Sequence, residues 1–308
     1  MINFRYHIVS LMAVFMALSV GIVLGVTLRG PVDEGLVTQA AQDRKQVQEL
    51  RAELDRVKAL DDYRDAWAAR AGMELTQNVL TGRSVAIVAM PDAPTGVVNA
   101  LRTAVTDSGG TLTHTARVDD AVFDPTQSAP VTKALDEFTS QLSLTDSMTN
   151  GTKFGLVLGR ALLGRQLVER DDLAVEITES LTEAGLITVD GNSPDTAELA
   201  IVVTAATATP QLSAETLTDH VQFDLALESA AGGIVVAGPN SDGLDATDVL
   251  TVRNDVAAVD RLSTVDVADL TSGVTTTILA GKEQLVGRHG HYGALTKADA
   301  PLPELPVR

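Results

Sequence analysis

The sequence predicts an α/β protein with a single N-terminal transmembrane helix, a coiled-coil stalk and then a mostly parallel, Rossmann-like sheet domain. Three observations support this prediction. Residues near the N-terminus form a long uncharged run, those that follow carry apolar side chains at heptad spacing, and the remainder alternates short apolar runs with helical stretches. We therefore expect five segments: a short cytoplasmic end (1–7), a transmembrane anchor (8–28), a coiled-coil stalk (33–80), an α/β head (82–293) and a Pro-rich disordered tail (294–308).

The anchor is predicted from the length of the uncharged run, which covers the 21 residues from Ile8 to Leu28. As a helix this run is about 31 Å long, enough to cross a hydrocarbon core of about 30 Å, and it exceeds the apolar core of a cleaved signal peptide. Arg5 and the terminal amine precede it, whereas Arg29 is soon offset by acidic residues. This charge balance predicts a single-pass protein of the cytoplasmic membrane, with the N-terminus inside and the head on the extracytoplasmic side.

Small residues recur along one face of the anchor. Ala13, Ala17, Gly21 and Gly25 are spaced by four, and the last two form a G-x-x-x-G pair. This spacing lets two transmembrane backbones approach closely, and it predicts pairing with a second copy or with a partner helix. Gly and Ala are also common in membrane helices that do not pair, which is the alternative interpretation.

The stalk is predicted from a heptad pattern. Val47, Leu50, Leu54 and Val57 occupy successive a and d positions, a choice of residues that suits a two-stranded coil. Glu53 at g and Lys58 at the following e are placed to form a salt bridge between parallel helices. The alternative is one amphipathic helix that packs against its own head. The coiled coil is preferred because it continues the pairing face of the anchor.

Apolar runs separated by helical stretches predict the elements of the head. The predicted strands are 84–90, 111–118, 186–189, 199–204, 233–238 and 261–265. The predicted helices are 95–108, 174–184, 214–231 and 274–286. Such alternation is typical of a mostly parallel sheet covered on both faces. Residues 119–153 are rich in Ser, Thr and Asp and are interpreted as an insertion or a flexible helical excursion.

The head is strongly acidic. Residues 82–308 carry 14 Lys or Arg against 31 Asp or Glu, so nucleic acid would be repelled and is excluded as a partner. Asn240, Asp242, Asp245 and Asp248 could hold a hard cation, but their spacing departs from a calcium loop and solvated turn residues are the preferred interpretation. No nucleophile–base pair or catalytic motif is recognisable, so no enzymatic activity and no certain cofactor are predicted.

One short motif near the C-terminus suggests a metal. In His289-Gly290-His291 the two imidazoles lie at i and i+2, and they point the same way if the backbone is extended. Imidazole suits copper or zinc, so His289 and His291 are the candidate metal ligands. Two ligands do not complete a site, and a turn that caps the domain is the alternative.

Both ends of the chain resemble a known family. Residues 5–25, from Arg5-Tyr6-His7 onward, and the C-terminal Ser263-Thr-Val-Asp266 and Gly290-His-Tyr-Gly293 look like the signatures of the MctB copper-transporter family. The resemblance implies a membrane protein of the cell envelope with a role in copper homeostasis or efflux. For SteB-like members of corynebacterial type it implies instead the remodelling of the cell wall during cell separation, together with a membrane partner.

The physics of membranes limits what one such chain can do. A pore needs several helices or a closed barrel, because lipid cannot satisfy open backbone groups, and this sequence offers one apolar helix. We therefore expect the protein to act as an interaction scaffold rather than as a pore by itself. The expected partners are a second copy, through the anchor and the coiled coil, and a second membrane or envelope protein.

Overall fold

The structure of the chain is a computed structural model that describes residues 4–206, 212–240 and 247–305. The side chains of the first helix are described at 7–27, 39–40 and 42–76. The chain divides into two compact units, residues 1–64 and residues 65–308.

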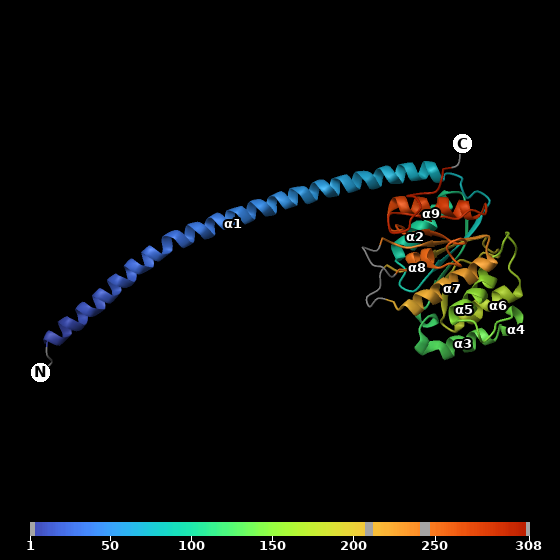
Figure 1. The fold of residues 1–308 in the computed structure, drawn as a ribbon, viewed down its shortest axis with the longest axis horizontal. Helices are drawn as coiled ribbons and strands as arrows, with labels where there is room; N and C mark the ends of the chain where they lie inside the picture. The colour runs from blue at the N-terminus through green and yellow to red at the C-terminus, as the bar shows by residue number, and fades with distance from the viewer. Residues whose placement is uncertain (1–3, 207–211, 241–246, 306–308) are drawn as a thin grey trace. The chain divides into compact units, whose positions relative to one another are not determined.

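Helix α1 (Phe4–Thr76) makes up the first unit and enters the second (Figure 1, blue to cyan). Residues 7–27 of α1 are long and apolar enough to cross a membrane, and their side chains are exposed. It is the one such helix in the described part of the chain. The backbone stays helical through Gly30 and Pro31, which lie between the predicted anchor (8–28) and the predicted stalk (33–80). Proline fixes φ in the helical range, so a helix can retain it at the cost of one backbone hydrogen bond.

The second unit is built around a seven-stranded sheet with the order β3-β2-β1-β4-β5-β6-β7. All neighbouring strands run parallel except β2 and β3. The strands are β1 (Ser84–Ala89), β2 (Thr111–Val118), β3 (Ile187–Asp190), β4 (Leu199–Val203), β5 (Gly233–Ala237), β6 (Ser263–Val265) and β7 (His291–Tyr292). The prediction of a mostly parallel α/β sheet is confirmed.

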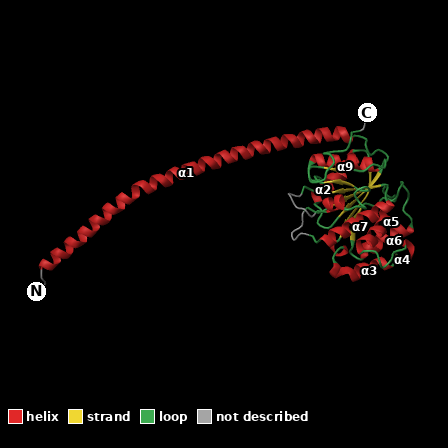
Figure 2. Cartoon of the chain, in the orientation of Figure 1, coloured by secondary structure: helices red, strands yellow, loops and turns green. Residues whose placement is uncertain are grey.

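Helices cover both faces of this sheet, as Figure 2 shows in red around the yellow strands. Helices α2 (Thr95–Asp107) and α9 (Thr271–Gln284) lie on one face. The other face carries α3 (Ser128–Asp136), α5 (Asn150–Leu162), α6 (Asp172–Glu183), α7 (Ala214–Ala230) and α8 (Asp248–Asn254). The short helices η1 (Asp120–Val122), η2 (Pro125–Gln127) and α4 (Thr139–Leu142) lie between β2 and α5 in the chain.

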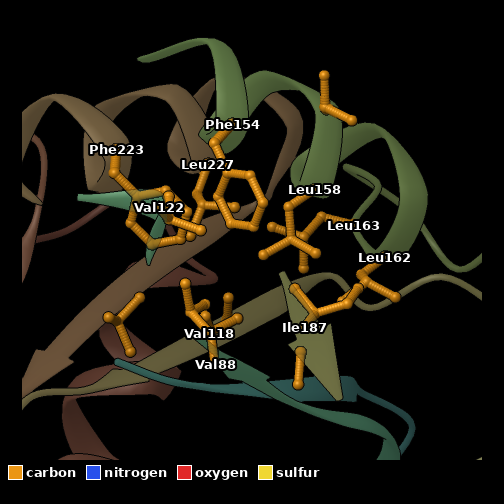
Figure 3. Close-up of a cluster of buried hydrophobic side chains, with 14 of the residues drawn as sticks. Val88, Val118, Val122, Phe154, Leu158, Leu162, Leu163, Ile187, Phe223 and Leu227 are labelled. Atoms are coloured by element: carbon orange, nitrogen blue, oxygen red, sulfur yellow. The ribbon is translucent and has the colours of Figure 1, made fainter. Parts of the chain in front are cut away.

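Alternate residues of the central strands enter two separate cores. Along β1, Ala86 and Val88 face the α5 and α7 side, whereas Val85 and Ile87 face the α2 and α9 side. Strands buried on both faces read as continuous apolar runs, which is why the sequence revealed them. Figure 3 shows the first core, where Phe154 of α5 and Phe223 of α7 meet the sheet. The two rings are stacked with centroids 5.9 Å apart.

Two segments are more ordered than the sequence suggested. Residues 119–153 fold into short helices and turns whose apolar side chains, such as Leu135 and Phe138, are buried in the first core. The start of the predicted disordered tail is also tied to the head. Asp299 donates a backbone hydrogen bond to His291, and Ala300 forms a bridge with Tyr292. The burial of residues 119–153 depends on elements distant in the sequence, so local composition did not predict it.

Candidate functional site at the carboxyl edge of the sheet

The order of the strands creates a switch point between β1 and β4. From β1 the chain crosses to β2 on one side over α2, whereas β4 and the later strands lie on the other side and α7 covers the opposite face. In open α/β sheets, ligands bind outside the carboxyl ends of the strands at such a point. Asp92, just after β1, adopts a positive φ of 59°, a conformation that few residue types other than glycine tolerate.

A cleft of about 370 Å³ opens at this point. It is lined by residues that follow β1, β2 and β4 and by the starts of α7 and α8. Its lining consists of Met90, Pro91, Asp92, Asp120, Phe123, Asp124, Pro125, Ala205, Leu212, Thr216, His220 and Asp248. We call this the switch-point cleft. Its volume is within the range of small-ligand pockets.

His220 and Asp248 form a buried pair in the wall of the cleft. His220 Nδ1 lies 2.6 Å from Asp248 Oδ1, and both side chains are more than nine-tenths buried. Because a carboxylate only accepts, Nδ1 carries the proton and a neutral His220 has its lone pair on Nε2. The Phe123 ring and the imidazole pack in a T-shaped arrangement with centroids 4.3 Å apart. Among the described residues, Nε2 has no hydrogen-bond partner.

Asp224 lies one helical turn after His220 on α7 and is 2% exposed. Its Oδ1 is buried and has no partner in the described part of the structure. Burial, followed by the nearby Asp248 carboxylate, raises the pKa of Asp224 well above its ordinary value of 3.8. A buried carboxyl group without a partner is costly, and such groups cluster at functional sites.

Two other buried atoms without a partner, His114 Nδ1 and Thr115 Oγ1, lie on β2. Burial and the Arg170 guanidinium lower the pKa of His114 to about 4. Like Asp224, these two residues are not part of the lining of the switch-point cleft, so we do not assign any of the three to the site.

A second groove of about 580 Å³ adjoins the cleft and shares Phe123, Asp124, Pro125 and Thr216 with it. Glu215 and Asp219 also line this groove. The described lining of the two together holds several carboxylates and no Lys or Arg. This part of the head therefore combines several negative charges with apolar lining residues such as Val122 and Phe123.

The C-terminal motif forms a different buried cluster, centred on Arg253 of α8. Its guanidinium donates to Asp266 Oδ2 at 2.7 Å, to Thr264 Oγ1 at 2.8 Å and to the carbonyl oxygens of Tyr292 and Thr296. Asp266 also accepts from the backbone N–H groups of residues 294 and 295. We call this the Arg253 cluster; it joins β6, β7 and the following loop.

The glycines of the motif fit around this cluster. Gly293 has φ +134°, and a Cβ there would overlap the carboxylate of Asp266. A Cβ on Gly290 would meet the hydroxyl of Tyr292, which itself donates to Glu283. Burial and that carboxylate raise the pKa of Tyr292. The residue pattern Gly-His-Tyr-Gly is therefore explained by close packing.

The predicted metal ligands His289 and His291 differ in their surroundings. His291 is buried, with Nδ1 3.0 Å from Thr264 Oγ1 and Nε2 3.1 Å from the Val259 carbonyl. Burial and the Arg253 guanidinium lower its pKa. His289 is partly exposed and lies 4.0 Å from Asp260. No group of three His, Cys, Asp or Glu in the described residues is placed to hold a metal, and binding by this pair stays a prediction.

Of the predicted turn cluster after β5, the structure describes Asn240 and Asp248. Asp242 and Asp245 lie outside the described residues. Asn240 donates its backbone N–H to Asp269. Asp248 was interpreted as a solvated turn residue, and this was wrong, because the fold buries it against His220 of another helix. The one signal that could have revealed the pair is the rule that residues following parallel strands gather at one edge of the sheet.

The predicted pairing residues of α1 are exposed. Ala13, Ala17, Gly21 and Gly25 present an open face, and no atom lies within 4 Å of where a Cβ on either glycine would be. The heptad residues Val47, Leu50, Leu54 and Val57 are between 46% and 58% exposed. Pairing through either set stays a prediction.

Comparison with known proteins points to one family. The family model described as "Copper transport outer membrane protein, MctB" matches residues 1–303. Relatives named "Copper transporter MctB" from Mycobacterium tuberculosis and Mycobacterium bovis are 28% identical over 317 residues, which cover 95% of this chain and 96% of each relative. The relative of that name from Mycobacterium leprae is 28% identical over 310 residues, with the same coverage.

Proposed function

Because this chain belongs to the MctB family, we propose that it is a single-pass membrane protein of the cell envelope that serves copper homeostasis or efflux as an oligomeric scaffold. Copper is the cargo named for its relatives. The observation that carries the scaffold is helix α1, which combines a membrane-length apolar segment with an exposed apolar stripe. The proposal assigns no pore to the single chain.

The argument against a pore is the small number of segments that could span a membrane. The described residues contain one helix that could cross a membrane. The sheet of the head is open, with β3 and β7 at its edges, and helices cover both of its faces. An open sheet in lipid would leave backbone groups unsatisfied. Copper would therefore pass through a partner or through an assembly of several chains.

The argument for a dimer is the exposed stripe of α1. Val47, Leu50, Leu54 and Val57 follow the a and d spacing and are about half exposed in the single chain. Burying an exposed Leu or Val side chain fully is worth about 1.5–3 kcal/mol, so partial burial along the stripe would stabilise a pair of helices. Gly21 and Gly25 would continue this contact in the lipid, where small residues allow close approach.

The dimer can be tested with single cysteines, since the natural chain has none. Leu50→Cys occupies a d position, whereas Ala52→Cys lies two residues away at the outward f position. We expect mild oxidation of intact membranes to crosslink Leu50→Cys into a homodimer and to leave Ala52→Cys mostly monomeric. Equal crosslinking of the two variants, or none, would contradict a coiled-coil dimer.

The orientation can be tested in the same background. We propose that the N-terminus is cytoplasmic and the head extracytoplasmic. The side chain of Asp260 is 86% exposed, so a cysteine at this position of the head (Asp260→Cys) is accessible to a thiol reagent. A membrane-impermeant maleimide should label this variant in intact cells. Labelling only after the cells are permeabilised would show that the protein has the opposite orientation.

The copper role requires a test in cells that lack the gene. Complementation with the natural chain should restore survival in copper and lower cell-associated copper. Gly21→Leu combined with Leu50→Asp should fail to complement, because both pairing faces are disrupted, while Ala52→Asp on the outward face should succeed. Unchanged copper together with cells that fail to separate would favour the wall-remodelling role instead.

A partner protein is part of the proposal. A second membrane or envelope protein would supply the path or the activity that the head lacks. Affinity purification of the full-length chain from membranes should recover that protein with the natural chain and lose it with the Gly21→Leu, Leu50→Asp variant.

A further inference from the structure

We propose that the switch-point cleft binds an organic cation that carries N–H donors, an ammonium or a guanidinium group, with His220 Nε2 and the surrounding carboxylates as acceptors. The site lies in the head and does not depend on the pairing of α1. Neither the family description nor the names of the relatives assign a ligand to it.

The charge of the lining selects a cation. Asp92, Asp120, Asp124 and Asp248 line the cleft, and its described lining contains no Lys or Arg to balance them. The adjoining groove adds Glu215 and Asp219, again without a basic residue. Asp92 and Asp120 are exposed at the mouth, so they would attract a cation before it enters.

The buried groups select a donor of hydrogen bonds. His220 lines the cleft, is 5% exposed and uses only Nδ1 among the described residues, so that Nε2 is left as an acceptor. A ligand with an N–H group in the cleft would give this nitrogen a hydrogen-bond partner. Hydrogen bonds from a charged donor are the strong ones.

The same geometry disfavours a bare metal ion. The described residues contain no group of three His, Cys, Asp or Glu placed as ligands, whereas zinc takes four and calcium six or more. An organic cation needs only acceptors and an apolar wall. Met90, Phe123 and Leu212 provide that wall for its carbon chain.

The chemistry admits two sources for the cation. One is a free small amine, and the other is an Arg or Lys side chain of a partner protein. Three probes separate them: agmatine represents the free molecule, N-acetylarginine amide represents a side chain attached to a backbone, and N-acetylcitrulline amide is its neutral isostere.

The experiment follows the imidazole itself by NMR. The full-length chain in lipid nanodiscs is labelled with carbon-13 at its five histidines, and His220→Gln identifies the His220 signal. We expect agmatine or N-acetylarginine amide to shift this signal saturably and the citrulline compound to leave it in place. Binding of agmatine alone identifies a free amine as the ligand, and binding of both shows that a partner's side chain can enter.

Two variants and one control test the roles of the residues. Asp248→Asn removes the carboxylate that fixes the imidazole and should weaken binding about tenfold, the loss of one charge-assisted hydrogen bond. Asp120→Asn at the mouth should weaken it by about twofold, and more at low salt. Asp260→Asn, exposed and outside the cleft, removes the same charge and should change nothing.

Three results would overturn the proposal. The first is no saturable shift of the His220 signal with either guanidinium probe. The second is an equal shift with the citrulline compound, which would show that binding does not depend on the positive charge of the probe. The third is loss of the signal at equimolar copper(II) chloride with no response to the guanidinium probes, which would make the cleft a metal site.

Discussion

The two buried polar clusters of the head are built from similar groups but are satisfied to different degrees. In the Arg253 cluster, Arg253 and Asp266 have side chains exposed by 1% and 2%, and the guanidinium and carboxylate reach several partners each. At the switch-point cleft, His220 uses one nitrogen, and Asp224, one turn further along α7, has an oxygen with no described partner.

This difference separates a structural role from a binding role. A fully paired cluster fixes the edge of the sheet and has no capacity left for a ligand. An incompletely paired cluster at the carboxyl ends of the strands keeps acceptors free at the place where such folds bind ligands. The Gly-His-Tyr-Gly motif, although it stands out in the sequence, belongs to the first kind.

The largest expected effect comes from removing the carboxylate partner of Arg253. Asp266→Asn leaves a buried Arg253 that cannot lose its proton, so we expect the free energy of unfolding to fall by about 3–5 kcal/mol. Asp248→Asn leaves a histidine that can be neutral, and the expected loss is about 1–2 kcal/mol. Denaturant unfolding of the full-length chain measures both. Equal losses would remove the distinction between the clusters.

Glycine substitutions should separate close packing from backbone strain. Gly293→Ala adds a Cβ that overlaps Asp266 at a positive φ, and we expect a loss of about 2–4 kcal/mol. Gly287 also has a positive φ, of 75°, but no atom lies near its Cβ position. Gly287→Ala should therefore cost only about 1 kcal/mol. Thermal unfolding of the two variants would show whether Gly293 has the role assigned to it.

The two predicted metal ligands should behave unequally. His291→Ala breaks two buried hydrogen bonds and should lower the free energy of unfolding by about 1–3 kcal/mol. His289→Ala, on the partly exposed residue, should change it by less than about 0.5 kcal/mol. Copper titration of the same variants tests the metal prediction. Weaker copper binding in His289→Ala, without loss of stability, would support it.

The last expected effect depends on pH and concerns Asp224, which lies next to the His220–Asp248 pair. The pKa of Asp224 is raised in the fold, so the stability linked to this group is present at low pH and is lost as the pH rises. Asp224→Asn removes the titration. Relative to the natural chain, the variant should gain stability as the pH increases from about 4 to about 8. A constant difference across this range would mean that Asp224 has a partner in solution.

The sequence predicted the elements whose burial is uniform. Strands β1, β4 and β5 were predicted within a residue of their observed ends, because a strand buried on both faces is apolar almost throughout. The short β7 was missed, as was helix α8. Both are held in place by Arg253 and its partners, which lie far apart in the chain, so no local pattern indicates them.

By itself, the sequence determined the membrane-length helix, the heptad stripe, the acidity of the head and its parallel sheet, since each depends on composition or on a short periodicity. Only the tertiary structure decided which polar residues are buried and with which partners. It placed Asp248 against His220 and gave each nitrogen of His291 a hydrogen-bond partner. Burial is set by elements that meet in space rather than along the chain. The candidate site is therefore a property of the folded sheet.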